Sequence, residues 1–163
     1  MVQSLSFNYN AVEKFKYSDG HYHLLIPLFF SVKNYSNHRA DFLFDTGAYL
    51  TVITRRTAVL FEFDKIRPVK EDISLNGFVG SCTGSLIEIP GMVLGGHRLT
   101  NVRVAVPHVD TKVNILGLNV LEHFNYLIDG ENSLIYFSEN KNYKLPIELA
   151  CRDIFIQDNE SNG

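Results

Sequence analysis

The sequence predicts an all-β fold, either a small barrel or a sandwich. Short runs rich in β-branched and aromatic residues follow one another at close spacing along most of the chain. Glycine-containing turns separate many of these runs, as in hairpins. The 163 residues are enough for one ordinary domain but too few for two, and a composition with 45% hydrophobic and 20% charged residues is typical of a globular domain.

The first expected elements are a hairpin and a short helix. The β-rich runs at residues 24–34 and 40–45 predict two strands, and the polar stretch YSNH at 35–38 predicts the turn between them. Residues 49–53, YLTVI, form a further short β-rich run. Residues 54–61 could then form at most one or two turns of helix.

Two further hairpins are expected in the middle of the chain. Residues 71–77 and 84–90 predict two strands joined through GFVGSCTG, at 77–84. The glycines of this connection favour a flexible hairpin tip, and they are Gly77, Gly80 and Gly84. Residues 91–107 predict the next hairpin, with Gly95-Gly96 at its turn.

The last part of the chain predicts a short strand that ends at Gly117, followed by a helix from Leu118 to about His123. Residues 126–137 then predict a final hairpin with Asp129-Gly130 at the turn. Residues 144–156, KLPIELACRDIFI, are compatible with an extra strand or with a helix followed by a strand.

Charge and hydropathy exclude some classes of function. The formal net charge of −3 argues against a nucleic-acid surface. The polar N-terminus has no signal-peptide core, and the most apolar window, residues 24–32, is too short to cross a membrane and contains Pro27. Cys82 and Cys151 do not form a CxxC pair and suit a reduced compartment. The sequence leaves open whether the two form one disulfide. We therefore expect a cytoplasmic protein with no nucleic-acid or membrane partner.

One acid occupies an unusual place, in FLFDTGAYLTVI at residues 42–53. Asp45, Thr46 and Gly47 could form an ordinary turn, because Asp accepts backbone hydrogen bonds and Gly tolerates left-handed dihedrals. The apolar runs on both sides, however, indicate a loop that is buried or half-buried. An isolated ionised carboxylate is costly in such a place, so a functional role becomes the better interpretation.

This stretch resembles the retroviral-type (retropepsin-like) aspartic proteases. The family pattern is two apolar residues, Asp-Thr-Gly-Ala, a small polar residue, any residue, Thr or Ser, and two apolar residues, which correspond here to residues 43–53. A later apolar-apolar-Gly element before a short helix corresponds to Ile115, Leu116 and Gly117. The resemblance covers roughly residues 22–137, and one departure is Tyr49, where the family usually has Asp, Ser or Thr.

The resemblance implies a small closed β-barrel with one or two short helices that acts as a homodimer. The protease domain would span residues 22–137, between an N-terminal segment at 1–21 and a C-terminal extension at 138–163 with a frayed end. The glycine-rich hairpin would be the flap over a peptide substrate, and its expected substrate-binding residues are Asn76, Gly77, Phe78, Val79 and Gly80.

The resemblance also implies an aspartic endopeptidase in which two carboxylates share one proton and activate water. The chain contains one Asp-Thr-Gly, so each subunit would supply one Asp45. Thr46 would hydrogen-bond to the partner chain, Gly47 would let the backbone pass close to substrate, and Ala48 would support the same loop. No cofactor and no metal are implied.

Two alternatives remain open at this point. The chain could be a non-catalytic barrel that serves as a dimerisation or peptide-binding module, which Tyr49 and the C-terminal extension would favour. His21 and His23 alternate before a strand and could face a metal together, but the sequence nearby offers no Cys or third ligand. We therefore expect no metal site.

Overall fold

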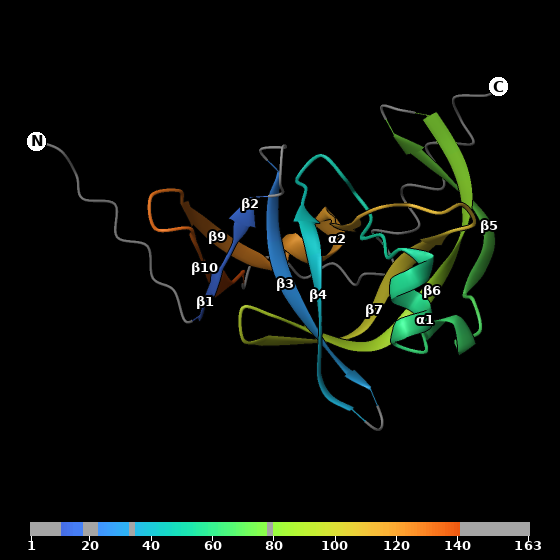
Figure 1. Cartoon of the computed structure of the whole chain (residues 1–163), viewed down its shortest axis with the longest axis horizontal. Coiled ribbons are helices and arrows are strands. Elements are labelled where there is room, and N and C mark those ends of the chain that lie inside the picture. Colours follow the sequence, from blue (N-terminus) through green and yellow to red (C-terminus); the bar gives the residue numbers. More distant parts are fainter. Residues whose placement is uncertain (1–10, 18–22, 33–34, 78–79, 141–163) are drawn as a thin grey trace, which may run out of the picture.

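The computed structural model (Figure 1) describes residues 11–17, 23–32, 35–77 and 80–140. Its short helices are α1 (Arg55–Leu60), the 3-10 helix η1 (Phe63–Lys65) and α2 (Leu118–Leu121). The strands are β1 (Ala11–Lys14), β2 (Lys16–Tyr17), β3 (Leu24–Val32), β4 (Tyr35–Phe44), β5 (Lys70–Gly77), β6 (Gly80–Leu94), β7 (His97–Pro107), β8 (Asn114–Leu116), β9 (Phe124–Asp129) and β10 (Leu134–Glu139). The predicted all-β class with short helices is confirmed.

The larger sheet closes on itself through a single residue, Val52. The strands run in the order β5-β6-β3-β4-β8, and β7 pairs with the other side of β6 while β2 pairs with β3. Val52 bridges Ile115 on β8 and Ala105 on β7. The neighbours β8, Val52, β7, β6, β3 and β4 therefore form a closed ring. This is the small closed barrel that the resemblance implied.

A smaller sheet has the order β1-β10-β9. Its antiparallel register places Ala11 opposite Phe137 and Leu134 opposite Asp129. The sequence did not predict β1, because AVEK has neither an apolar alternation nor a turn signal. The limits of the predicted domain, residues 22–137, remain a prediction.

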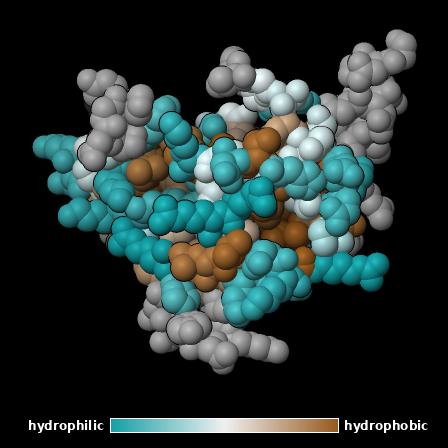
Figure 2. Space-filling view, turned by 45° about the vertical axis from the view of Figure 1, so that its right-hand side comes forward, coloured by the Kyte–Doolittle hydropathy of each residue, from teal (hydrophilic) through white to brown (hydrophobic). Residues whose placement is uncertain are grey.

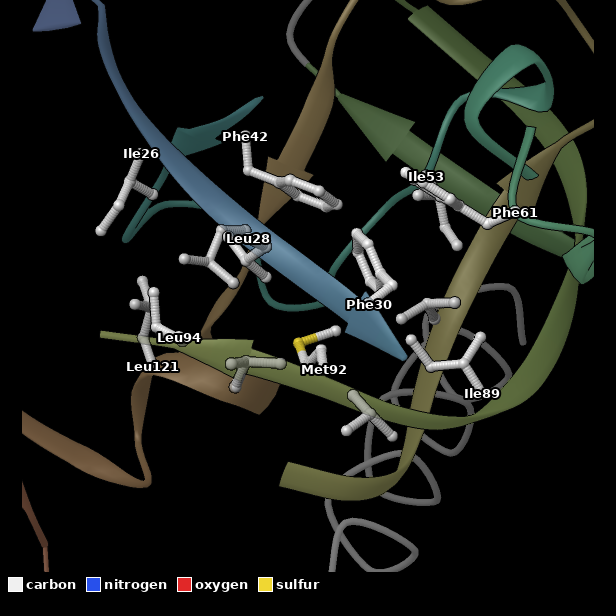
Figure 3. Packing of buried hydrophobic residues seen from close by; sticks show 14 of the residues in the cluster. Ile26, Leu28, Phe30, Phe42, Ile53, Phe61, Ile89, Met92, Leu94 and Leu121 are labelled. Carbon is white, nitrogen blue, oxygen red and sulfur yellow. The ribbon is translucent and has the colours of Figure 1, made fainter. Parts of the chain in front are cut away.

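The core inside the barrel is rich in phenylalanine. Phe30 lies with its ring centroid 4.9 Å from that of Phe61 and 5.9 Å from that of Phe42. Figure 3 shows these rings beside Met92 and Ile53, so that side chains from β3, β4, β6 and the segment after Asp45 meet in one cluster. Burying such large rings contributes much of the stability of a domain this size.

The predicted turns at Gly95-Gly96 and Asp129-Gly130 are confirmed as hairpin connections. Gly95 and Gly96 have φ of +51° and +81°, the sign that a tight two-residue hairpin turn requires at both positions. A Cβ on Gly95 would also lie 2.6 Å from the Phe137 ring. At the second turn, the Asp129 carboxylate accepts a hydrogen bond from the backbone N–H of Asn132 at 3.1 Å.

Both predicted helices are confirmed as well. Helix α1 begins after Thr54, whose hydroxyl accepts a hydrogen bond from the backbone N–H of Thr57 at 3.0 Å. This is the usual role of a threonine at a helix N-cap. Helix α2 follows Gly117 directly and ends at Leu121, slightly earlier than predicted.

The predicted turn at 35–38 is wrong. These residues belong to β4, where Val32 pairs with Tyr35 and Phe30 pairs with His38. The polar composition of YSNH suggested a turn, but its backbone groups pair with β3. The ring of His38 also packs 5.6 Å from that of Phe61, so tertiary contacts override the turn propensity of Ser and Asn.

The predicted strand at 49–53 is also wrong, because this segment is extended but does not form a strand. The segment makes isolated bridges instead of a strand, because it passes between β7 and β8 and pairs with each over very few residues. The backbone N–H of Val52 donates to the Ile115 carbonyl at 2.9 Å, and that of Ile53 donates to the Ala105 carbonyl at 2.9 Å. The β-branched composition thus supports an extended backbone without a continuous ladder.

The flexible tip predicted over residues 77–84 is much shorter in the structure. Strand β6 already begins at Gly80 and continues through Pro90, so the two strands expected on either side of Pro90 are one. Gly84 pairs with Ile73 and also with Pro107, and a Cβ there would lie 2.8 Å from the Val106 carbonyl oxygen. This glycine therefore permits close packing of strands and does not loosen a loop.

Some predictions fall on residues outside the described part of the chain. They concern the segment 144–156, the flap residues Phe78 and Val79, His21 and Cys151. Among the described residues, no helix is both long and apolar enough to cross a membrane.

Candidate active site

Asp45 directly follows β4 and begins a tight turn. Its backbone N–H donates to the Leu116 carbonyl at 3.1 Å, which ties the turn to the end of β8. Its Oδ1 accepts a hydrogen bond from the backbone N–H of Gly47 at 2.8 Å, and its carbonyl accepts one from Ala48 at 3.3 Å. The carboxylate is half-buried, whereas Thr46 and Gly47 are exposed. Asp45, Thr46 and Gly47 therefore do form the turn that their residue types allow. The Asp45 carboxylate remains accessible at the surface of the domain.

The two sequence motifs lie against each other. The parallel pairing of β4 and β8 places Leu43 opposite Ile115 and Phe44 opposite Leu116. Gly117 follows at the point where the chain crosses the segment after Asp45, and a Cβ on it would lie 2.6 Å from the Leu50 carbonyl carbon. Its φ of −98° is ordinary for any residue. The glycine is therefore needed for space between the two segments, not for an unusual backbone.

A buried hydrogen-bond network fastens this crossing. The Asn119 Oδ1 accepts from the backbone N–H of Thr51 at 2.7 Å and from its hydroxyl at 2.8 Å. The Thr51 hydroxyl oxygen in turn accepts a hydrogen bond from the backbone N–H of Gly117 at 3.1 Å. The Asn119 Nδ2 donates to the Arg103 carbonyl on β7 at 2.8 Å. One side chain thereby links the Asp45 segment, the Gly117 element and β7.

A second asparagine fixes the other end of the same segment. The buried Asn114 accepts a hydrogen bond from the backbone N–H of Thr54 at 2.9 Å. Its Nδ2 donates to the Asp41 carbonyl on β4 at 3.1 Å. The residues between these anchors therefore have little freedom to move relative to β4 and β8.

The carboxylate of Asp41 is the best-paired acid near the site. Partial burial alone would raise its pKa, but the hydrogen bonds and positive charges of Lys16 and Arg39 outweigh burial and hold the pKa below its ordinary value of 3.8. The Lys16–Asp41 ion pair joins β2 to β4 across the start of β3, and the Arg39–Asp41 pair lies within β4. They stabilise the strand that presents Asp45 without touching the Asp45 turn.

The predicted flap is the end of the β5–β6 hairpin. Gly77 pairs with Gly80, whose φ is +139°, and Asn76 is exposed beside them. In Figure 1 this hairpin end lies at the upper right, and the arrowhead of β4 points upward near the centre of the view. Leu75 on β5 and Leu50 in the segment after Asp45 pack against the same apolar cluster, so the hairpin and this segment adjoin each other.

A small apolar cluster lies between the Asp45 segment and the hairpin. Its buried members are Ile73, Leu86 and Ala105, and the partly buried side chains packed against them are Leu50, Val52 and Leu75. Apolar side chains from the Asp45 segment and from β5 therefore pack together beside the turn. Within the described residues, no group of three His, Cys, Asp or Glu side chains could hold a metal ion.

The family model described as gag-polyprotein putative aspartyl protease matches residues 34–123, more than half of the chain. This range contains Asp45, the hairpin and Gly117. The chain belongs to this family.

Two solved structures have a fold similar to that of this chain. A retropepsin-like aspartic protease from Rickettsia conorii is similar with a TM-score of 0.53 and 20% identity, over 82% of this chain and 95% of that one. The retroviral protease-like domain of Ddi1 from Leishmania major is similar with a TM-score of 0.50 and 17% identity, over 74% of this chain and 98% of that one. The comparison with curated proteins found no match.

Sequence reasoning missed the buried polar residues that hold this family member's site together, which are Thr51, Asn114 and Asn119. A signal was present for the asparagines, since both are amides within the otherwise apolar stretch VNILGLNVL. Buried amides of this kind almost always have hydrogen-bond partners. Their partners lie 16 to 73 residues away in sequence, so the pairing itself could not be predicted.

Proposed function

We propose that this chain is an aspartic endopeptidase that acts as a homodimer, with Asp45 of each subunit forming the catalytic pair. The observation that carries the proposal is the Asp45 turn. A backbone N–H from Gly47 holds one carboxylate oxygen while the residues beside it remain exposed. One such turn supplies half of a two-carboxylate site, and a second copy related by a twofold axis supplies the other half.

In the proposed mechanism the two Asp45 carboxylates share a single proton. The ionised carboxylate takes a proton from a water molecule while the water oxygen attacks the scissile carbonyl carbon. The protonated carboxyl group gives its proton to the carbonyl oxygen. The tetrahedral intermediate then collapses, the C–N bond breaks, and the leaving nitrogen takes up a proton. Every atom of the water ends in the two products, so no further reactant is required.

The surrounding residues would position this chemistry. Thr46, exposed in the single chain, would hydrogen-bond to the partner, and Gly47 would allow close approach of a peptide. Ala48, whose carbonyl accepts from the Leu118 N–H at 2.8 Å, would hold the turn on helix α2. The element formed by Ile115, Leu116 and Gly117 would support the turn from beneath.

The flap would cover a peptide or protein substrate and exclude water from the reacting atoms. Its described residues Asn76, Gly77 and Gly80 are exposed at the end of the hairpin, and Phe78 and Val79 would complete the tip. The apolar cluster around Leu50 and Val52 supports a preference for apolar side chains in the substrate.

We expect the enzyme to work in the cytoplasm, which suits its unpaired Cys82.

A non-catalytic dimerisation or peptide-binding module is the alternative. Tyr49 favours it, because a large aromatic residue stands where the family usually has a small polar one. The backbone of Tyr49 is nevertheless held in place, since its carbonyl accepts from the Asn119 N–H at 2.9 Å. A module would dimerise and bind peptides but would not cleave them.

The decisive experiment is a peptide-library cleavage assay on the wild-type protein and on Asp45→Asn. We expect cleavage by the wild type and none by the variant, with the fold and the dimer unchanged. Asp64→Asn is a matched control, because it removes an exposed carboxylate on η1 and should leave activity intact. Equal cleavage by Asp45→Asn and the wild type would refute the proposal, and binding without cleavage by both would favour the module.

A further inference from the structure

His108 lies at the base of the β5–β6 hairpin, immediately after β7. Its backbone N–H donates to the Thr83 carbonyl on β6 at 2.9 Å. Its ring uses both nitrogens, with Nδ1 at 3.2 Å from the Thr83 hydroxyl and Nε2 at 3.0 Å from the Ser85 hydroxyl. The imidazole therefore connects the end of β7 to two successive same-face positions of β6.

Strand β5 presents two carboxylates to the same place because its pairing with β6 is irregular between Lys70 and Ile73. Irregularities of this kind redirect side chains, and Asp72 has a φ of +53°. The Ser85 hydroxyl donates to the Glu71 Oε2 at 3.1 Å, and the Asp72 Oδ1 lies 3.7 Å from the His108 Nδ1.

The hydrogen bonds determine which ring nitrogen carries the proton in neutral His108. Ser85 uses its only hydrogen on Glu71, so its oxygen must accept from the ring, and Nε2 is the protonated nitrogen. Nδ1 is then an acceptor for the Thr83 hydroxyl. In this state the ring has no hydrogen to offer Asp72.

Protonation changes this arrangement at one point. Nδ1 gains a hydrogen and the ring gains a positive charge 3.7 Å from the Asp72 Oδ1, while the bond from Nε2 to Ser85 persists. The Thr83 hydroxyl must turn so that its oxygen faces the ring. A neutral contact of 3.7 Å thus becomes an ion pair that ties β5 directly to the end of β7.

We propose that His108 is a pH-sensitive clamp that restrains the β5–β6 hairpin when it is protonated. The charged groups that face it are Glu71 and Asp72 from β5 and Arg55 from α1. Arg55 directs its Nη1 to the His108 carbonyl at 3.2 Å and not to the ring, so the two carboxylates dominate around the imidazole. The function of the clamp as a flap control rests on the proposed peptidase, but the clamp itself does not.

His108 lines an open groove of about 630 Å³ between α1, η1 and the hairpin. Glu71, Ser85 and Arg55 line the same groove, as does Asp64 from η1. Figure 2 brings this side of the molecule forward and shows brown apolar areas set among teal hydrophilic side chains. The clamp is thus in contact with solvent.

The test is amide hydrogen exchange at pH 5.5 and pH 8.0, the range over which histidine side chains ordinarily change charge. Protection factors of the described amides at 73–77 and 80–83 remove the intrinsic pH dependence of exchange. In the wild type we expect them to be about two- to fivefold higher at pH 5.5, the scale of a solvent-screened ion pair. His108→Gln keeps a donor for Ser85 but cannot titrate, and it should abolish the difference.

Asp72→Asn provides a second variant that does not alter the ring. Asparagine tolerates the positive φ of this position as aspartate does, so the loss of the pH difference would report the ion pair alone. His23→Gln, a change at an exposed histidine before β3, should retain it. A pH difference that persists in both His108→Gln and Asp72→Asn, or none in the wild type, would overturn the clamp. Because exchange needs no substrate, a protein without peptidase activity could still show the clamp.

Discussion

The side-chain oxygen of Asn119 accepts hydrogen bonds from both the backbone N–H and the hydroxyl of Thr51, at 2.7 and 2.8 Å. Helix α2 is thereby fastened to the segment that leaves Asp45. The Thr51 hydroxyl also receives the Gly117 N–H, so the network reaches the element on which the Asp45 turn rests.

Asn119→Ala should therefore destabilise the domain. It leaves the buried Thr51 donors and the Arg103 carbonyl unsatisfied, and we expect the free energy of unfolding to fall by about 1–3 kcal/mol or slightly more. Urea denaturation measures this change. Asn125→Ala, at an exposed position on β9, is the control and should stay within about 0.5 kcal/mol of the wild type. Similar values for the two variants would show that the network contributes little.

Gly117→Ala should be destabilising for a steric reason. The added methyl would lie 2.6 Å from the Leu50 carbonyl carbon, and separating the segments should cost about 1–3 kcal/mol. Gly130→Ala is the matched control, because a Cβ there meets nothing within 4 Å. Thermal unfolding of both variants, together with cleavage by Gly117→Ala, would show whether the crossing supports stability and activity. A Gly117→Ala protein as stable as Gly130→Ala would contradict the close approach.

Activity should depend on association of two chains. Since each subunit would contribute one Asp45, specific activity should fall when the protein is diluted below its dimer dissociation constant. Sedimentation and kinetics over a single concentration series measure both quantities, and a tandem-linked pair of chains is the control that should resist dilution. A fully active monomer would exclude the two-chain site.

The contribution of Asp41 to stability should depend on pH. Because Lys16 and Arg39 lower the pKa of this carboxyl in the folded protein, the contribution is complete above the ordinary value of 3.8 and is lost as pH falls through the lower folded value. The stability difference between the wild type and Asp41→Asn should thus be largest near neutral pH and shrink below about pH 4. Urea midpoints between pH 3 and pH 7 measure it. A difference that grows toward acid pH would mean that the folded pKa is not lowered.

Several parts of the fold could be predicted from the sequence because local chemistry decides them. Paired glycines at 95 and 96 allow a tight hairpin whatever surrounds them, and Thr54 can cap a helix with its own hydroxyl. The motif around Asp45 likewise identified the candidate site, since an acid between two apolar runs is costly without a function. The element at Ile115–Gly117 could be predicted from the sequence. Its contact with Leu50 could not.

Other features were decided only by the tertiary structure. The Val52 bridges that close the barrel, the pairing of β1 with β10, and the bonds of Asn119 to Thr51 all join groups far apart in sequence. A backbone amide or a buried asparagine needs a partner, but its own sequence neighbourhood does not say which distant segment supplies it. The sequence by itself therefore determined the turns at Gly95-Gly96 and Asp129-Gly130, the helices α1 and α2 and the presence of Asp45. The packed fold alone determined which residues hold that acid in place.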